Sequence, residues 1–198
     1  MGAFSRQDRS HETRAVLLKA TSERLWLEDD FQLRISDICS DTSLSSSAIY
    51  SNFRSRQGLI DATLLQIYDE VCVGYETALS VIMNVAKSTD EIIEQLIKMN
   101  EAPGRNYGQM RLRITTAALS RKKFREGFSK IRESHLANLE VIYANLQRRQ
   151  VISAKLDARQ LVLFFEGFNY ARAGNELNEH PESNGGWFDM LHLLLDAD

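Results

Sequence analysis

The chain has 198 residues, of which 43% are hydrophobic and 26% are charged, with a formal net charge of −3. This composition provides enough apolar side chains for a core and excludes a protein that coats nucleic acid through a bulk basic charge. No run of about 18 apolar residues is present, so no membrane-spanning segment is expected. The charged segment 1–14 lacks the apolar stretch of a secretion signal, so we expect a cytoplasmic protein.

Helical periodicity covers most of the chain, and the alternation typical of β-strands is scarce. The sequence therefore predicts an all-α fold of about nine helices. Their expected bounds, in chain order, are 8–28, 35–41, 45–52, 56–87, 90–100, 107–119, 123–149, 158–177 and 187–195. We expect the chain to divide near residue 60, into an N-terminal unit of residues 8–60 and a larger helical body of residues 61–198.

Small polar side chains stand at the starts of four of these helices. A hydroxyl or carboxylate at this position can accept a backbone N–H that has no partner inside the helix. We expect this role for Ser45, Ser55, Asp157 and either Ser88 or Thr89. The starts of these helices are therefore predicted with a physical reason for each.

The segment 33–56 is the most informative part of the chain. Its two short helices and the turn between them, at about residues 34–53, are typical of a helix-turn-helix DNA-binding unit. The second of these helices carries small, hydrogen-bonding side chains, which suit insertion into a DNA major groove. The candidate DNA-binding residues are Arg34, Ser45, Ser46, Ser47, Ala48, Tyr50, Asn52, Arg54 and Arg56.

These candidates divide into two kinds of contact. Ser46, Ser47 and Ala48 lie in the first turn of the predicted recognition helix, where side chains approach the bases. The other candidates, at positions 34, 50, 52, 54 and 56, are interpreted as contacts to the phosphate backbone. Up to residue 56 the chain carries eight basic and eight acidic side chains, so affinity for DNA must come from their placement.

Taken together, these features resemble the TetR family of transcriptional regulators over about residues 14–62. The resemblance rests on the spacing of Leu25-Trp26, Phe31, Ile35, Ile38, Leu44-Ser45, Ile49-Tyr50, Asn52-Phe53, Arg56, Leu59 and Ile60. It implies a helix-turn-helix domain followed by a helical body that binds a small effector and dimerises.

The chain departs from the family pattern at three informative positions. Asp30 and Ser43 stand where the family carries glycine, and Arg56 stands where it carries lysine. A left-handed backbone at Ser43 would cost on the order of 1 kcal/mol, because side chains with a Cβ disfavour it. We therefore expect strain at the turn between the two short helices.

Aromatic and methionine side chains are frequent in the body. Such residues are more often plain core than pocket lining, but the resemblance implies an effector cavity among the middle helices. Lining of this kind would suit an apolar or amphipathic small molecule. The candidate effector-binding residues are Tyr68, Cys72, Tyr75, Met110 and Arg113.

The last two predicted helices are apolar on more than one face. This surplus is consistent with a two-fold interface between identical chains, or with a final helix that only closes the core of its own chain. The resemblance favours the dimer. The candidate dimer residues are Phe164, Phe168, Ala171, Trp187, Leu191 and Leu194.

No catalytic or metal-binding pattern stands out. Cys39 and Cys72 fit no metal spacing, the four histidines form no pair at metal-binding spacing, and no glycine-rich phosphate loop or nucleophile elbow is present. We therefore expect no enzyme activity, no cofactor and no metal. The basic run at 121–125 is interpreted as a solvated helix start rather than as a second nucleic-acid site.

The sequence thus predicts a ligand-responsive transcriptional regulator that acts as a repressor and binds a palindromic operator as a homodimer. A second interpretation stays open at this point. The neutral N-terminal unit and the departures at Asp30 and Ser43 also fit a dimeric protein that binds small molecules or protein partners and binds DNA weakly or not at all.

Overall fold

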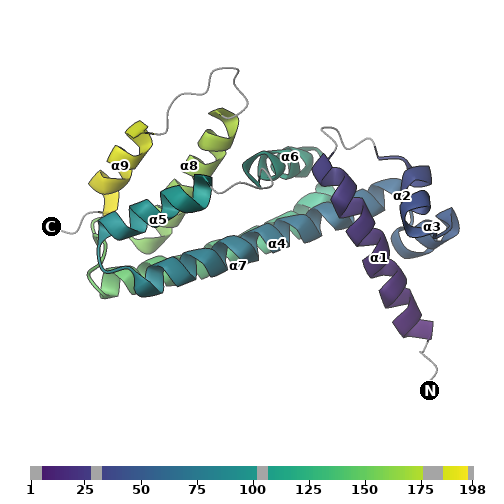
Figure 1. Cartoon of the computed structure of the whole chain (residues 1–198), viewed down its shortest axis with the longest axis horizontal. Helices are drawn as coiled ribbons and strands as arrows, with labels where there is room; N and C mark the ends of the chain where they lie inside the picture. Colours follow the sequence, from purple (N-terminus) through teal and green to yellow (C-terminus); the bar gives the residue numbers. More distant parts are fainter. Residues whose placement is uncertain (1–5, 28–32, 102–106, 176–184, 196–198) are drawn as a thin grey trace. The chain divides into compact units, whose positions relative to one another are not determined.

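The structure, a computed structural model, describes residues 6–27, 33–101, 107–175 and 185–195 (Figure 1). Within these ranges it contains nine α-helices and no strands, which confirms the predicted all-α fold. The helices are α1 (Arg6–Leu27), α2 (Ile35–Thr42), α3 (Ser46–Phe53), α4 (Arg56–Val85), α5 (Thr89–Glu101), α6 (Tyr107–Ser120), α7 (Lys122–Arg148), α8 (Ala158–Asn175) and α9 (Gly185–Leu195). None of them is long and apolar enough to cross a membrane.

The chain forms two compact units that adjoin in sequence within α4. Unit 1 comprises residues 1–68, and unit 2 comprises residues 69–198. The division near residue 60 that the sequence suggested also falls within this helix. One continuous helix therefore contributes its first turns to unit 1 and its last turns to unit 2.

The core of unit 1 forms where α1 packs on α2 and α3 (Figure 1). Leu17, Thr21 and Leu25 follow one another at four-residue spacing along α1, and all three are fully buried. Val16, the neighbour of Leu17, is 41% exposed. Neighbouring residues on a helix point about 100° apart, so burial of Leu17 turns the Val16 side chain away from the core.

The turn after α2 contains the expected left-handed residue. Ser43 has φ 55° and ψ 22°, a left-handed conformation that favours glycine, which is the residue that the family pattern has at this position. Thr42 stabilises the turn, because its hydroxyl donates to the Ile38 carbonyl (2.7 Å) and accepts the Leu44 N–H (3.3 Å). Ser43 therefore adopts the backbone conformation that side chains with a Cβ disfavour.

Three of the expected helix caps are present. The hydroxyl of Ser55 accepts the Gly58 N–H (2.9 Å), and that of Ser88 accepts the Glu91 N–H (3.3 Å). At the start of α8, the Asp157 carboxylate accepts the N–H of residue 160 (2.7 Å). Each bond satisfies a backbone donor that the helix itself leaves without a partner.

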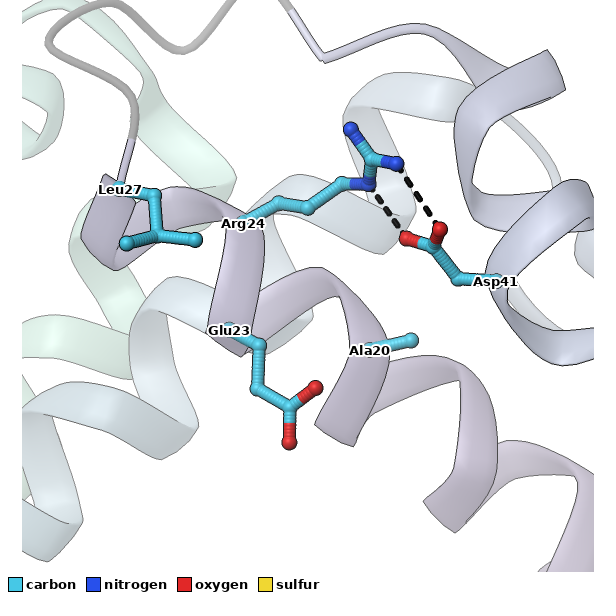
Figure 2. Close-up of a pocket in the computed structure, with 5 residues that line it drawn as sticks. All are labelled: Ala20, Glu23, Arg24, Leu27 and Asp41. Atoms are coloured by element: carbon cyan, nitrogen blue, oxygen red, sulfur yellow. Dashed lines mark hydrogen bonds and ion pairs between the residues drawn. The ribbon is translucent and has the colours of Figure 1, made fainter.

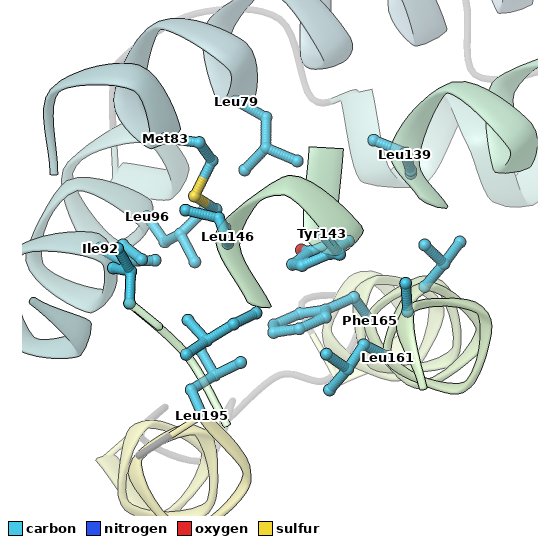
Figure 3. Close-up of a cluster of buried hydrophobic side chains, with 14 of the residues drawn as sticks. Leu79, Met83, Ile92, Leu96, Leu139, Tyr143, Leu146, Leu161, Phe165 and Leu195 are labelled. Carbon is cyan, nitrogen blue, oxygen red and sulfur yellow. The ribbon is translucent and has the colours of Figure 1, made fainter. Parts of the chain in front are cut away.

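Unit 2 is built around one large apolar cluster (Figure 3). Helices α4, α5, α7, α8 and α9 all contribute to it, together with the linker between α7 and α8. Tyr143 on α7 and Phe165 on α8 stack in its interior, with ring centroids 5.2 Å apart. The buried members that Figure 3 labels are Leu79, Met83, Ile92, Leu96, Leu139, Tyr143, Leu146, Leu161, Phe165 and Leu195.

Side chains at the end of α7 satisfy backbone carbonyls at the end of α4 and in the linker between α7 and α8. The Arg149 guanidinium, directly after α7, donates to the carbonyls of Met83 (2.6 Å) and Ala86 (3.1 Å) at the end of α4. The Gln147 amide donates to the linker carbonyls of residues 153 (3.0 Å) and 156 (2.6 Å). The linker is therefore held by named hydrogen bonds as well as by its buried apolar residues.

The carbonyl of Leu195 at the end of α9 joins three segments. It accepts the N–H of Ser153 in the linker (2.8 Å) and the hydroxyl of Thr89 at the start of α5 (3.4 Å). The Thr89 hydroxyl also lies 3.2 Å from the linker carbonyl of Val151. The end of α9 is thus fastened to two other parts of unit 2.

Candidate nucleic-acid interface

Helix α3 has one buried face and one exposed face. Ile49 and Phe53 point into the core of unit 1 and are 0% and 7% exposed. On the other face Ser46, Ser47 and Tyr50 are exposed, and half of the Tyr50 side-chain surface is accessible. The burial of one face fixes the helix, so the exposed face presents small polar groups in a defined orientation.

Ser45 occupies the N-cap position of α3 with extended backbone, but its hydroxyl does not cap the helix. Instead it lies 2.7 Å from the Ser47 hydroxyl. The prediction that Ser45 caps α3 is therefore wrong, because the Ser47 hydroxyl is a competing partner for the Ser45 hydroxyl. Both hydroxyls are exposed, and a hydroxyl can rotate to donate to or accept from a base edge.

Asn52 serves the interior of unit 1. Its amide nitrogen donates to the Ala48 carbonyl (2.8 Å), and its amide oxygen accepts the Ser10 hydroxyl of α1 (3.5 Å). Both Asn52 and Ala48 are half-buried. The side chain that the sequence suggested as a phosphate contact is thus already used to connect α3 to α1.

Arg14 on α1 holds the end of α3, a role that sequence reasoning missed. Its guanidinium donates to the Asn52 carbonyl (3.2 Å) and lies 4.4 Å from the centroid of the Phe53 ring. A cation at this place interacts favourably with the negative end of the helix dipole and with the ring face. No local sequence pattern distinguishes this arginine, because the contact joins residues far apart in the chain.

The three candidate arginines of unit 1 differ in their surroundings. Arg34, at the N-cap of α2, and Arg54, directly after α3, are both exposed. Arg56 is half-buried, and its Nε donates to the carbonyl of Leu33 before α2. Arg56 therefore links the start of α4 to the segment before α2, whereas Arg34 and Arg54 are exposed to solvent.

The approach of α3 to α4 requires glycine at position 58. A Cβ at Gly58 would collide with the backbone carbonyl of Phe53, well inside van der Waals contact. Arg54, between the two helices, has φ 68° and donates its N–H to the Tyr50 carbonyl (2.9 Å). This tight turn fixes the start of α4, where the N-terminal backbone groups of a helix suit a phosphate.

An ion pair ties α1 to α2 beside an open surface hollow (Figure 2). The Arg24 guanidinium contacts both carboxylate oxygens of Asp41, at 2.5 and 2.9 Å. The hydrogen bond from Arg24 holds the pKa of Asp41 below its usual range. Ala20, Glu23 and Leu27 complete the hollow. The ion pair on the wall of this hollow therefore holds α1 against α2.

The candidate effector-binding residues lie at different depths. Tyr68, the last residue of unit 1, is fully buried. In unit 2, Cys72 and Met110 are buried, whereas Tyr75 and Arg113 are half-buried. Of these, Tyr75 lies beside a group of buried polar side chains that the sequence did not reveal.

The first part of this group joins α7 to α4. His135 is 2% exposed, and its Nδ1 lies 2.5 Å from a carboxylate oxygen of Glu76. The other oxygen of Glu76 accepts the Asn138 amide (2.8 Å), and the Tyr75 ring meets the His135 ring edge-on at 6.1 Å. Burial lowers the pKa of His135, and the hydrogen bond to Glu76 only partly opposes this effect.

The second part joins α6, α7 and α8. Glu166 is 5% exposed and accepts two hydrogen bonds from Arg132, at 3.2 and 2.5 Å. The buried Arg111 guanidinium lies 3.6 Å from the same carboxylate and 5.2 Å from the ring centroid of Tyr170. The Tyr170 hydroxyl in turn lies 3.1 Å from the Thr115 hydroxyl. The buried Glu166 and Arg111 therefore connect side chains of α6, α7 and α8 in one polar network.

The candidate dimer residues also lie at different depths. Phe168 and Leu191 are buried within unit 2, Phe164 and Leu194 are half-buried, and Ala171 is exposed. The side chain of Trp187 lies outside the described part of the chain. On α8 and α9, the exposed apolar or small residues are Leu163, Gly167, Ala171 and Leu193.

The basic run after α6 performs a structural role. Arg125 donates to the carbonyls of Ala118 (2.8 Å) and Leu119 (2.5 Å) at the end of α6. The Arg121 guanidinium lies 5.3 Å from the Phe124 ring centroid. Among the described residues, no group of three or more His, Cys, Asp or Glu side chains could hold a metal ion.

No known family profile and no curated protein sequence matches the chain. Solved structures do match over nearly its whole length. A TetR-family regulator from Pectobacterium atrosepticum has a TM-score of 0.67 and 20% identity, covering 96% of this chain and 95% of its own. The reduced form of NemR from Escherichia coli has a TM-score of 0.69 and 16% identity, with coverages of 95% and 99%.

A transcriptional-regulator candidate from Saccharomonospora viridis, solved with choline, has a TM-score of 0.71 and 15% identity, with coverages of 94% and 99%. At these identities the likeness concerns the fold. The chain has the fold of TetR-family transcriptional regulators, as the resemblance of segment 14–62 predicted.

Proposed function

We propose that the protein is a DNA-binding transcriptional regulator whose α3 reads the major groove. The observation that carries this proposal is the exposed serine-rich face of α3, set on a buried apolar face within a helix-turn-helix unit. A recognition helix needs both faces, one to fix its orientation and one to reach the bases. Similarity of fold to transcriptional regulators supports the same conclusion.

The contacts to DNA divide between base edges and phosphates. Ser46 and Ser47 can hydrogen-bond to bases in the groove, and the exposed Tyr50 hydroxyl suits a phosphate. Arg34 at the start of α2 and Arg54 directly after α3 are exposed and can supply positive charge to the phosphates. Arg14 contributes indirectly, since it fastens the end of α3 on which these contacts depend.

We propose that the protein acts as a dimer on a palindromic operator. The exposed face of α8 carries Leu163, Gly167 and Ala171, and no side chain lies within 4 Å of a Cβ placed at Gly167. Small residues allow close approach of a second helix, and Leu193 on α9 adds exposed apolar surface. An Ala171→Arg variant should therefore sediment as a monomer, whereas a Lys98→Ala variant should sediment as the wild type does.

We further propose that the regulator is a repressor released by a small effector bound in unit 2. The choline complex of the S. viridis protein supports the idea that this fold accommodates small molecules. Because α4 belongs to both units, an effector that changes its position in unit 2 can lower affinity for the operator. By linkage, the operator must weaken effector binding by the same factor.

The deciding experiment is selection of bound sites from random DNA, followed by affinity measurements over a range of salt concentrations. We expect a palindromic site whose affinity falls steeply with salt, because phosphate contacts release counterions. Enrichment of no sequence, together with no salt-sensitive binding, would refute the proposed function.

Two variants separate base contacts from phosphate contacts. Ser47→Ala should change the preferred bases in a repeated selection, whereas Arg54→Ala should weaken all sequences alike and reduce the salt slope by about 1. Arg148→Ala, which removes an exposed cation of unit 2, is the matched control and should leave both properties unchanged. If Ser47→Ala and Arg54→Ala gave the same loss of preference, the assignment of roles would be wrong.

A further inference from the structure

The hydroxyl of Tyr143 lies at the centre of the apolar cluster of unit 2 (Figure 3). The residue is 1% exposed, and its ring stacks on Phe165 at an interplanar angle of 8°. Among the described residues the hydroxyl has no hydrogen-bond partner. Buried hydroxyls in proteins are nearly always satisfied, because leaving one unpaired forfeits the hydrogen bonds that it makes in water.

The hydroxyl is fixed in place by its neighbours. Phe165 packs against one face of the ring, and Leu139 and Leu146 lie near Tyr143 on the same helix. Burial raises the pKa of Tyr143 well above its usual value, and Tyr75 adds to this effect. Tyr143 is therefore a neutral, oriented hydrogen-bond donor inside an apolar region.

The side chains of the cluster around Tyr143 are apolar, and the charged side chains of the polar network are not members of it. Glu76 is held by His135 and Asn138, and the Tyr75 ring meets the His135 ring edge-on. Glu166 on α8 accepts hydrogen bonds from Arg132 on α7 and lies 3.6 Å from Arg111 on α6. A charged ligand group beside the Tyr143 hydroxyl would lose its hydration among apolar side chains, which disfavours its binding there.

We infer that Tyr143 is the polar anchor of the effector site and that the effector is an uncharged, mainly apolar molecule with one hydrogen-bond acceptor. An aryl ketone has this chemistry. The inference rests on the proposed function, because it names the effector class of the same regulator. Since the hydroxyl is fully enclosed, the ligand can reach it only when α4, α7 and α8 separate, which links binding to the position of α4.

The test uses three compounds of nearly the same size and the full-length protein without DNA. Acetophenone carries the acceptor, α-methylstyrene replaces its oxygen by CH₂, and benzoate adds a charge. Calorimetry should show the tightest binding for acetophenone. In the Tyr143→Phe variant the preference for acetophenone over α-methylstyrene should fall about tenfold, as expected for one lost hydrogen bond, while binding of α-methylstyrene persists.

Tyr107→Phe, which removes an exposed tyrosine hydroxyl, is the matched control and should keep the wild-type preference. Three results would overturn the inference: no binding of any compound by the wild type, tightest binding of benzoate, or an unchanged preference in Tyr143→Phe. None of them depends on DNA. Operator binding that persists alongside any of them would leave the proposed DNA-binding function intact.

Discussion

Units 1 and 2 each contain a bidentate arginine–carboxylate pair, and the two pairs lie in different surroundings. In unit 1, the side chains of Arg24 and Asp41 are 29% and 39% exposed. In unit 2, the Glu166 side chain is 4% exposed and lies near two arginines. An exposed pair contributes little to stability, whereas removing one member of a buried pair leaves a charge without compensation. The ion pair of unit 1 is thus accessible to solvent, whereas the buried ion pair of unit 2 links α6, α7 and α8.

The strongest test of this difference is Glu166→Gln. The variant keeps the shape of the side chain but leaves the buried Arg111 facing a neutral group. We expect the free energy of unfolding of unit 2 to fall by about 3 kcal/mol, measured by urea denaturation. Glu94→Gln, which breaks the exposed Lys98–Glu94 pair, should change it by less than about 0.5 kcal/mol. Equal changes in the free energy of unfolding for the two variants would show that burial does not determine how much an ion pair contributes to stability.

The next largest effect is expected at Gly58, in the tight turn of unit 1. Gly58→Ala forces a methyl group against the Phe53 carbonyl and should destabilise unit 1 by about 2 kcal/mol. Gly74 lies in the same helix, and apart from its own helix backbone no atom of the described residues lies within 4 Å of a Cβ at that position, so Gly74→Ala should stabilise by about 0.5–1 kcal/mol. Thermal denaturation of both variants measures the contrast, and effects of the same sign would refute the steric argument.

The pH dependence of stability should come from unit 2. Burial lowers the pKa of His135, so below about pH 6.5 the unfolded chain binds a proton that the folded chain does not bind. The free energy of unfolding should therefore decrease as the pH falls from about 6.5 to the pKa of the folded state. Urea denaturation between about pH 7.5 and 5 should show a shallower slope for His135→Gln and an unchanged slope for the exposed His11→Gln.

The smallest effect is expected at the turn after α2. Ser43→Gly removes the cost of a left-handed backbone and should stabilise unit 1 by at most about 1 kcal/mol. Ser36→Gly, at an exposed position inside α2, should destabilise by about 0.5–1 kcal/mol. The sign of the difference between the two variants, measured by thermal denaturation, decides whether Ser43 is strained.

Local patterns were sufficient to predict the helices and the left-handed turn. Periodic apolar residues define α1 to α9, and caps such as Ser55 and Asp157 act within three residues of their partners. The conformation of Ser43 followed from the family pattern. These features depend on neighbours in the sequence, so the sequence alone carries most of the information about them.

Contacts between distant segments were not predictable in this way. The pairing of His135 with Glu76 and that of Arg14 with α3 each join helices far apart in the chain. Asn52 and Arg56 carry side chains suited to phosphate, yet both are engaged inside unit 1. Residue type indicated what these groups can do, but only the packing of the helices determines what they contact.

The hydrogen bond from Ser153 to the Leu195 carbonyl allows the attachment of α9 to be measured by hydrogen exchange at a single amide. The Ser153 amide, which donates to this carbonyl, can exchange its proton with solvent only when the end of α9 leaves the linker. Because Thr89 shares the same acceptor, detachment should release the start of α5 in the same opening event. Hydrogen exchange at Ser153 therefore reports how cooperatively the last helix opens, and slower exchange at higher protein concentration would place α9 in the contact between two chains.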